Sequence, residues 1–405
     1  MSLRSRLSWL VPLLWVGCGT EATESQFQDT VASSSHSETF SVEDLSRVST
    51  EGVLQQLLEA EHAAGMPGAF AEVWDGTQVW RGAVGVADVD TGRPMQPGFR
   101  HRVGSLTKTF VATTVLQLVG EQRIQLDAPI GAYLPDVVPG ALGGRVTVRM
   151  LLNHTSGLGD YPDAILVTPE DFEAVRSRTF TPRELVAHGL ALPPTDVPGA
   201  RYSYSNTNYI LAGLLIERVT GRSLEDVVAR RILWPLGLHD TYFPGTRMHV
   251  RGAHSKAYVP WADGTLRDFS VYNMSWGWAA GALVSTTRDI NRFYQALLAG
   301  RLLAPAQLAE MLTPVRNPND PAAGYGLGLS YSMLPCGPVW GHTGGLLGHR
   351  TFTFHRADGS RRVTLAENLT RYETPGQPHP INKARSKFMV TALCGPAVAV
   401  SSAGE

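Results

Sequence analysis

The spacing of apolar residues changes along the chain and divides it into regions with different predicted structure. In the N-terminal region, apolar positions three and four residues apart predict an amphipathic helix that ends near Gly65. These positions are Val53, Leu54, Leu57 and Leu58. Two strand-like runs follow at residues 69–74 and 77–80, and Asp75-Gly76 between them is a strong hairpin signal.

The middle of the chain, residues 127–279, has a mostly helical pattern. Pro and Gly interrupt short helical runs, for example at residues 147–152 and 181–187. A clearer helix begins near residues 202–207 and ends before Gly221. Its inward face is expected to consist of Ile210, Leu211, Leu214 and Leu215.

Strand patterns return in the last quarter of the chain. A helix over residues 286–300 comes first, with Asp289 completing a capping box at its start. Its inward residues are Ile290, Phe293 and Leu297. The expected strands cover residues 338–343, 351–354 and 362–366, and a helix over 381–393 follows them.

These elements predict an α+β fold: an antiparallel β-sheet flanked by N- and C-terminal helices, with a mostly helical inserted subdomain. The sheet part would comprise residues 46–126 and 280–396 and the helical part residues 127–279, within one domain over 46–396 and before a tail at 397–405. A crevice between two such parts is a favoured place for a ligand.

The first residues have the pattern of an export signal. Arg4 and Arg6 precede an apolar run that ends at Gly17 and is too short to span a bilayer. Residues 18–45, which are rich in Ser, Thr, Glu and Gln, predict a flexible tether. We therefore expect a protein of the periplasm or cell envelope, or a secreted one. The formal net charge is −1 and no long basic block occurs, which argues against nucleic acid as a partner.

The number of cysteines is consistent with an exported protein. Cys18 directly follows the apolar run and resembles the lipidated cysteine of a bacterial lipobox, which would anchor the chain to a membrane; ordinary cleavage and release is the alternative. If Cys18 is lipidated, Cys336 and Cys394 remain as an even pair in an oxidising compartment. The three cysteines lack Cys-x-x-Cys spacing, which argues against a zinc or iron–sulfur site.

The candidate chemistry begins with Ser105 and Lys108 at the head of an apolar helical run that ends near Gly120. Because positions i and i+3 share one side of a helix, the lysine would lie one turn from the serine hydroxyl. A serine needs a neighbouring base to act as a nucleophile, and a buried lysine can lose its proton whereas an arginine cannot. A helix-capping serine with a solvated lysine is the alternative interpretation.

Two further motifs fall at the boundaries of predicted elements. Tyr204-Ser-Asn206 precedes the helix of the middle region, where Ser205 or Asn206 could simply cap that helix. Gly341-His-Thr-Gly-Gly345 lies on what we expect to be an edge strand, and its last two glycines could mark a bulge.

Taken in order, these motifs resemble the three active-site motifs of the penicillin-recognising serine hydrolases. This group holds secreted serine D-Ala-D-Ala carboxypeptidases, class C β-lactamases and related esterases, and the resemblance covers residues 50–396. It also includes the stretches 151–157 and 324–328. The carboxypeptidases are the most similar group, and Cys336 and Cys394 look like their paired cysteines.

The resemblance implies a role for each motif residue. Ser105 would attack the substrate carbonyl and form an acyl-enzyme, with Lys108 taking or relaying its proton. Tyr204 would also contact Ser105 and pass a proton to the leaving amine, and whether Lys108 or Tyr204 is the acylation base stays open. Asn206 would donate to the substrate amide.

The third motif would complete the site. His342 stands in place of the lysine of the Lys-Thr-Gly form, and Thr343 would bind a substrate carboxylate. Gly344 would belong to the substrate-binding strand, and the backbone N–H groups of Ser105 and Gly345 would form an oxyanion hole. The resemblance implies no metal or organic cofactor.

Two departures from the family pattern leave the substrate open: a missing arginine, and Gly345, which stands where a hydroxyl residue is common. The carboxypeptidases tend to carry an arginine on the strand before the third motif, but residues 328–332 hold no positive charge, and Arg350 is the candidate replacement. Trp276 is expected to line the cleft, with plain core packing as the alternative. We expect a monomeric D-Ala-D-Ala carboxypeptidase acting on cell-wall peptides. The alternatives are a β-lactamase or esterase, with a β-lactam or ester substrate, and a non-catalytic penicillin- or peptidoglycan-binding sensor.

Overall fold

The computed structural model describes residues 50–261, 263–373 and 377–396. The expected export signal, the tether with Cys18 and the tail at 397–405 lie outside these described residues. Within them, no helix has both the length and the apolar character needed to cross a membrane.

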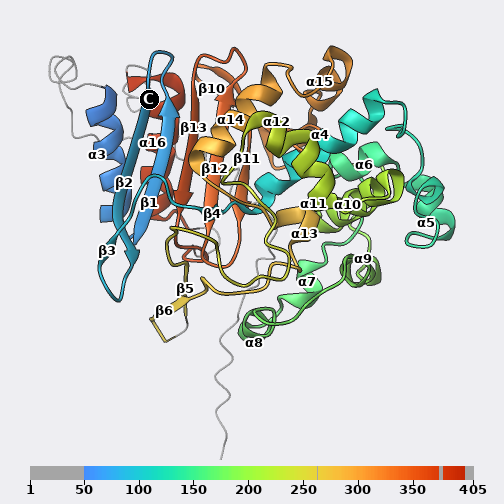
Figure 1. The fold of residues 1–405 in the computed structure, drawn as a ribbon, viewed down its shortest axis with the longest axis horizontal. Coiled ribbons are helices and arrows are strands. Elements are labelled where there is room, and N and C mark those ends of the chain that lie inside the picture. Colours follow the sequence, from blue (N-terminus) through green and yellow to red (C-terminus); the bar gives the residue numbers. More distant parts are fainter. Residues whose placement is uncertain (1–49, 262, 374–376, 397–405) are drawn as a thin grey trace, which may run out of the picture.

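A large antiparallel sheet forms one side of the molecule (Figure 1). Among the described residues it has nine strands in the order β3-β2-β1-β13-β12-β11-β10-β9-β8, so strands from both ends of the chain meet at its centre. In chain order they are β1 (Gly68–Trp74), β2 (Val79–Asp88), β3 (Arg93–Pro94), β8 (Val315–Asn317), β9 (Asp320–Tyr325), β10 (Ser330–Leu334), β11 (Gly337–Gly345), β12 (Arg350–Arg356) and β13 (Arg362–Glu367). Two short ribbons accompany it, formed by β4 (His101–Arg102) with β7 (Val284–Ser285) and by β5 (Tyr258–Pro260) with β6 (Leu266–Asp268).

Terminal helices cover one face of this sheet. Helices α3 (Thr50–Ala63) and α16 (Pro380–Cys394) pack side by side there, and Leu58 and Phe388 are fully buried between them and the strands. Helix α14 (Thr287–Leu298) covers the opposite face, where Asn291 donates to Glu72 and accepts from Thr364. The predicted α+β fold, with its flanking terminal helices, is therefore confirmed.

The rest of the chain is mostly helical and packs against α14 and the far half of the sheet (Figure 1). Helix α4 lies at its centre, in contact with α10 and α13. Its elements are η1 (Gly104–Leu106), α4 (Thr107–Gly120), η2 (Ile130–Ala132), α5 (Gly140–Arg145), α6 (Val148–Leu152), α7 (Pro162–Ile165), α8 (Pro169–Ala174), α9 (Pro182–Ala191), α10 (Asn206–Thr220), α11 (Leu224–Val228), η3 (Ala229–Leu233), α12 (Trp234–Leu236), α13 (Trp278–Gly281) and α15 (Pro305–Met311).

Helix α4 is buried nearly all round, including Lys108 and Thr113. Two local expectations were wrong. At the start of α14, Asp289 donates its N–H to Thr286, but its carboxylate accepts from Asp240 N–H and Thr241 instead of completing a capping box. Strand β11 is an interior strand between β10 and β12, and Gly341 lets β12 approach it closely. Only the part beyond Gly341 extends past β10.

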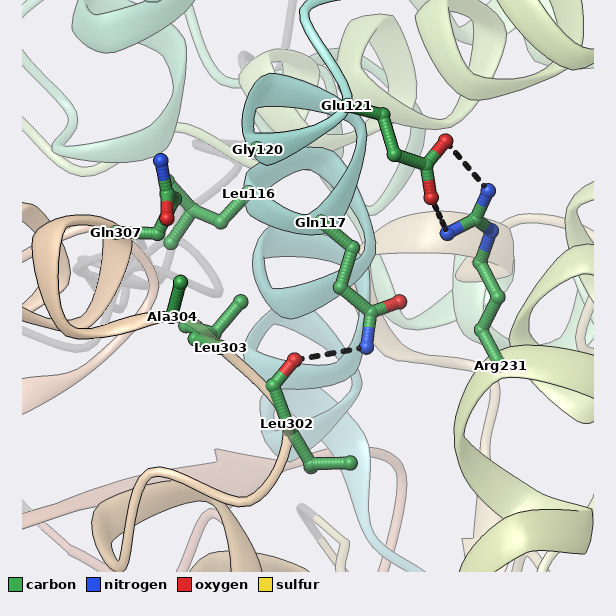
Figure 2. Close-up of a pocket in the computed structure, with 9 residues that line it drawn as sticks. All are labelled: Leu116, Gln117, Gly120, Glu121, Arg231, Leu302, Leu303, Ala304 and Gln307. Carbon is green, nitrogen blue, oxygen red and sulfur yellow. Dashed lines mark hydrogen bonds and ion pairs between the residues drawn. The ribbon is translucent and has the colours of Figure 1, made fainter.

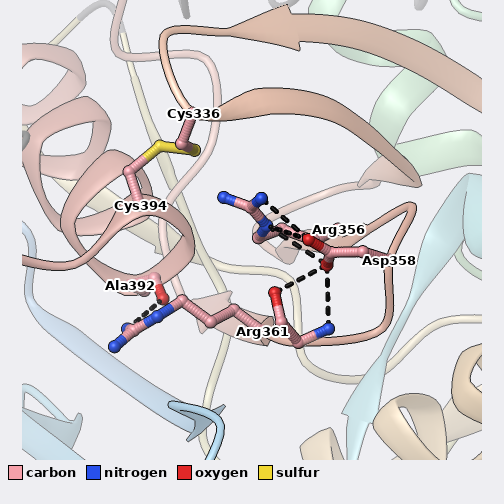
Figure 3. Close-up of a disulfide and its surroundings, with 7 residues drawn as sticks. Cys336, Arg356, Asp358, Arg361, Ala392 and Cys394 are labelled. Atoms are coloured by element: carbon pink, nitrogen blue, oxygen red, sulfur yellow. Dashed lines mark hydrogen bonds and ion pairs between the residues drawn. A yellow bond between two sulfur atoms is a disulfide. The ribbon is translucent and has the colours of Figure 1, made fainter.

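A disulfide joins α16 to the turn between β10 and β11 (Figure 3). It links Cys336 and Cys394, whose Cα atoms are 5.4 Å apart and whose separation in sequence is 58 residues. Nearby, Arg361 donates to the carbonyl of Ala392 near the end of the same helix. The end of the terminal helix is thus tied covalently to the hairpin that carries the third motif.

Candidate active site

The first motif lies in a sharp turn between β4 and α4. Gly104 has a φ of 59°, a left-handed conformation that favours glycine, and it directs the chain from the strand into η1. Thr107 Oγ1 donates to the Gly104 carbonyl at 2.7 Å, and Val103 N–H donates to the Leu283 carbonyl at 3.0 Å. Both ends of the turn are therefore fixed, and Ser105 is held at the head of the central helix.

Lys108 is fully buried one turn after Ser105. Its Nζ lies 3.0 Å from Ser105 Oγ, 2.7 Å from Asn206 Oδ1 and 2.8 Å from the Ala280 carbonyl. Asn206 Oδ1 and the Ala280 carbonyl can only accept, so in the neutral amine they take two N–H bonds and the lone pair faces the serine hydroxyl. This is the geometry that a base for Ser105 requires.

Tyr204 reaches the same serine from the segment before α10. Its hydroxyl donates to Ser105 Oγ at 2.9 Å, and its ring lies 4.8 Å from Lys108 Nζ. His154 stacks on this ring, with centroids 4.1 Å apart and an interplanar angle of 29°. The tyrosine is thus held by packing as well as by its hydrogen bond, and both candidate bases contact the nucleophile.

Asn206 is the first residue of α10 and connects the lysine to a buried acid. Its side-chain Nδ2 donates to Asp160 Oδ2 at 3.0 Å, and its backbone N–H donates to Asp160 Oδ1 at 2.7 Å. Burial raises the pKa of Asp160 to about 7, and the N–H donors of Asn206 oppose that rise. Since Asn206 Oδ1 accepts from Lys108, its expected donation to substrate depends on the remaining N–H of Nδ2.

His342 carries no charge at neutral pH. Its pKa is lowered to about 3, first by burial and then by the nearby charge of Lys108. Nδ1 lies 2.5 Å from the Thr343 carbonyl and must donate, so Nε2 accepts from Tyr325 Oη at 2.8 Å. A neutral ring therefore stands where the related motif has a lysine.

The end of β11 lies directly against the Ser105 turn. A Cβ built on Gly344 would be 2.0 Å from the Val103 carbonyl, and one built on Gly104 would be 3.0 Å from Gly345 N. Glycine at residue 344 thus permits the close approach of the two backbones. The N–H of Gly345 lies beside the turn that carries Ser105, as an oxyanion hole requires.

Arg350 and Trp276 are held in packed surroundings. The Arg350 guanidinium forms an ion pair with Glu373 and donates to Tyr372 at 3.2 Å, and its side chain is 7% exposed. Trp276 is 3% exposed, and its ring lies 6.4 Å from that of Tyr272 in the apolar core. Arg350 is thus already neutralised, and the position of Trp276 favours the core-packing alternative.

Three further residues of this site were missed from the sequence: His154, Asp160 and Tyr325. His154 and Tyr325 lie in the stretches 151–157 and 324–328, which carry the family resemblance without a role for any single residue. Asp160 gave no signal, because only the fold brings the loop after α6 against the start of α10.

The structure also has a cavity of about 410 Å³ at the opposite end of α4 (Figure 2). Gln117 donates to the Leu302 carbonyl beside it, and Glu121 pairs with Arg231 at its rim. At 1.5 Å of rise per residue, the end of the helix is about 18 Å from Lys108, so this cavity is separate from the Ser105 site. Across the described part of the chain, no cluster of three or more His, Cys, Asp or Glu residues is arranged to hold a metal.

A serine held between a buried lysine and a tyrosine, beside the end of an antiparallel strand, defines a serine hydrolase of the β-lactamase and penicillin-binding-protein fold. The chain belongs to the beta-lactamase family, whose model, described as Beta-lactamase, matches residues 53–385.

Similar proteins of this family act on several substrates according to their names. A D-aminopeptidase of Brucella anthropi is 32% identical over 314 residues, which is 76% of this chain and 56% of that protein. Esterase EstB of Burkholderia gladioli is 31% identical over 53% of this chain and 54% of its own length. The chain thus spans little more than half of these relatives.

Solved structures agree on the fold. A D-stereospecific amidohydrolase from Streptomyces sp. is 43% identical, with a TM-score of 0.74, over 79% of this chain and 94% of that one. The D-amino acid amidase from Ochrobactrum anthropi SV3, in complex with L-phenylalanine amide, is 27% identical with a TM-score of 0.71. This match covers 87% of this chain and 97% of that one.

Proposed function

We propose that this chain is a D-stereospecific amidohydrolase that cleaves amide bonds of D-amino-acid derivatives through an ester at Ser105. The observation that carries this proposal is the pair of hydrogen bonds that join Ser105 Oγ to Lys108 Nζ, at 3.0 Å, and to the Tyr204 hydroxyl, at 2.9 Å. The similarity to the Streptomyces amidohydrolase, at 43% identity, supports the choice of substrate.

The chemistry follows from the contacts. Ser105 Oγ attacks the carbonyl carbon while its proton passes to Lys108 or Tyr204. The oxyanion is stabilised by backbone N–H groups, and collapse breaks the C–N bond as the leaving nitrogen takes up a proton. Water then attacks the ester, its proton passes to the same base, and the D-amino acid and free Ser105 are released.

The charges around the site favour a neutral amide over a substrate with a free carboxylate. His342 is neutral and Arg350 is paired with Glu373, so neither offers a free positive charge for a carboxylate. This weakens the D-Ala-D-Ala carboxypeptidase expected from the sequence. That activity is the second candidate, favoured by the 26% identity to a penicillin-binding protein of Bacillus subtilis over 68% of that protein.

Parallel assays with one preparation of the purified protein distinguish the candidates. D-phenylalanine amide, its L enantiomer, an acyl-D-Ala-D-Ala peptide, a short-chain ester and a penicillin would be compared by kcat/KM. We expect the D-amide to be cleaved at least about tenfold faster than the L-amide, a difference of about 1.4 kcal/mol in the barrier. Equal rates on the enantiomers, or turnover of the acyl dipeptide or penicillin alone, would contradict the proposal.

We also propose that the chain is exported through residues 1–17, with Cys18 as a lipid anchor and residues 18–45 as a tether, and that it works as a monomer. The apolar run before Cys18 supports this route. Fractionation of cells that express the full chain and a Cys18→Ala variant tests it. The full chain should sediment with membranes and the variant should be soluble in the periplasm or medium. Cytoplasmic retention of both would contradict export.

A further inference from the structure

We infer that Asp160 is a positioning residue for this reaction: its carboxylate fixes the Asn206 amide in the one orientation that presents Oδ1 to Lys108. The inference rests on the proposed acylation of Ser105, since its effect is on the residue that activates that serine. It concerns a buried acid in the loop between α6 and α7.

The orientation follows from which atoms donate and which accept. An ionised carboxylate only accepts, and the two oxygens of Asp160 accept from Asn206 N–H at 2.7 Å and Nδ2 at 3.0 Å. The opposite end of the amide, Oδ1, then faces Lys108 Nζ at 2.7 Å. A flipped amide would place oxygen against oxygen at Asp160 and N–H against N–H at Lys108.

The orientation matters for proton transfer. Asn206 Oδ1 and the Ala280 carbonyl hold two of the three bonding positions of Lys108 Nζ, which directs the third at Ser105 Oγ. Because a flipped amide would remove one of these acceptors, the lysine would lose its alignment with the nucleophile.

The ionisation of Asp160 makes this arrangement sensitive to pH. Burial raises its pKa to about 7, and the charged groups that face it are Lys108 on α4, which lowers the pKa, and Asp163 on α7, which raises it. Protonation at lower pH converts one acceptor oxygen into a donor beside Asn206. Acylation should therefore increase as pH rises through about 7.

Two matched variants test the inference. Asp160→Asn keeps the shape but replaces one acceptor with a donor, whereas Asp163→Asn removes only an exposed neighbouring charge. The probe is D-phenylalanine p-nitroanilide, and the rate of the first turnover is measured from pH 5 to 9. We expect Asp160→Asn to acylate about 10- to 100-fold more slowly and without the rise near pH 7. Asp163→Asn should keep the maximal acylation rate of wild type, and its acylation rate should rise at a lower pH than in wild type.

The outcomes separate this inference from the proposed function. If the wild-type protein acylates and Asp160→Asn keeps both its rate and its pH profile, the positioning role is wrong and the amidohydrolase stands. If wild type forms no acyl-enzyme with this probe or with the D-amide, the proposed function itself is wrong. If Asp160→Asn does not fold, as judged by circular dichroism, the Asp163→Asn variant decides. An acylation rate that rises at the same pH in Asp163→Asn as in wild type would overturn the inference.

Discussion

Ser105 Oγ and Lys108 Nζ lie 3.0 Å apart across the first turn of the central helix, with the lysine fully buried. Two acceptors from other segments, Asn206 Oδ1 and the Ala280 carbonyl, fix the position of the amine. The neighbouring ring of His342 is neutral because burial lowers its pKa, so no second charge competes at the nucleophile. Activation of the Ser105 hydroxyl depends on this arrangement.

Substitution of the lysine by arginine should abolish catalysis although it keeps the positive charge. A guanidinium does not lose its proton and is too large for the fully buried position of Lys108. We expect Lys108→Arg and Lys108→Ala to lose at least about 100-fold in kcat/KM for a D-amino-acid amide. Near-normal rates for the arginine variant would show that proton acceptance is not the task of this residue.

Removal of the Tyr204 hydroxyl should slow the reaction without disturbing the site. The Tyr204→Phe variant keeps the ring that stacks on His154 but loses the 2.9 Å hydrogen bond to Ser105. We expect kcat to fall by about 100- to 10,000-fold, as for other general acid–base groups, with a smaller change in KM. The matched control is Tyr202→Phe, since Tyr202 packs on Tyr325, with centroids 5.7 Å apart. Equal losses in the two variants would contradict a chemical role for Tyr204.

The two glycines at the end of β11 should respond differently to alanine. A Cβ at Gly344 would lie 2.0 Å from the Val103 carbonyl and would push the strand away from the Ser105 turn, whereas a Cβ at Gly345 meets nothing within 4 Å. We expect Gly344→Ala to lose about 100-fold or more in kcat, as when an oxyanion-hole donor is lost, together with some stability. Gly345→Ala should stay within a few-fold of wild type. The reverse order would disprove the proposed contact.

Acid should destabilise the protein through its buried histidines. The pKa values of His101, His342 and His355 are lowered to about 3 by burial, below the ordinary value of about 6.5 that they regain on unfolding. The unfolded chain therefore binds protons that the folded chain does not. The free energy of unfolding should not be reduced by these histidines above about pH 6.5. As pH decreases from there towards 3, each such histidine should lower the free energy of unfolding by about 1.4 kcal/mol per pH unit.

One of these histidines provides a direct check. His355 stacks on Tyr294 away from Ser105, so a His355→Phe variant should retain an aromatic contact while it removes one titrating group. Urea denaturation between pH 4 and 7 should show a shallower pH dependence for this variant than for wild type. The exposed His239, replaced by glutamine, serves as the control. An unchanged slope in His355→Phe would refute the assignment.

Loss of the disulfide should lower stability more than activity. The Cys336–Cys394 bond anchors the end of α16 to the β10–β11 hairpin, and it closes a long loop. We expect the double variant Cys336→Ser/Cys394→Ser to lose about 2–4 kcal/mol of unfolding free energy, with a lower Tm. Since the bond lies at the far end of β11 from Gly345, kcat should change little at temperatures where the variant is folded. A normal Tm would contradict this structural role.

Much of the fold could be predicted because local signals were consistent with one another. Asp75-Gly76 separates two paired strands, and Gly221 ends α10 in a left-handed conformation, with a φ of 69°. The error at β11 has a physical cause: glycines typical of an edge also permit close packing inside a sheet, as the 1.8 Å between a Cβ at Gly341 and the Thr353 carbonyl shows.

The site was harder to predict where it depends on contacts between distant segments. Ser105 and Lys108 are one helical turn apart, so their contact follows from the sequence alone. Asp160 and Asn206 are 46 residues apart, and their hydrogen bonds exist only because α10 packs beside the loop after α6. The ion pair of Arg350 with Glu373, which removes the arginine from consideration as a carboxylate ligand, likewise required the folded chain.

The central claim, that Ser105 forms the acyl-enzyme, is tested most directly by trapping that ester. The protein would be mixed with a radiolabelled D-phenylalanine ester or amide, quenched in acid within one turnover, and digested for peptide mass spectrometry. We predict the label on the peptide that contains Ser105, and neither label nor turnover in a Ser105→Ala variant with an unchanged circular dichroism spectrum. Turnover retained in that variant, or label on a different residue, would contradict the account.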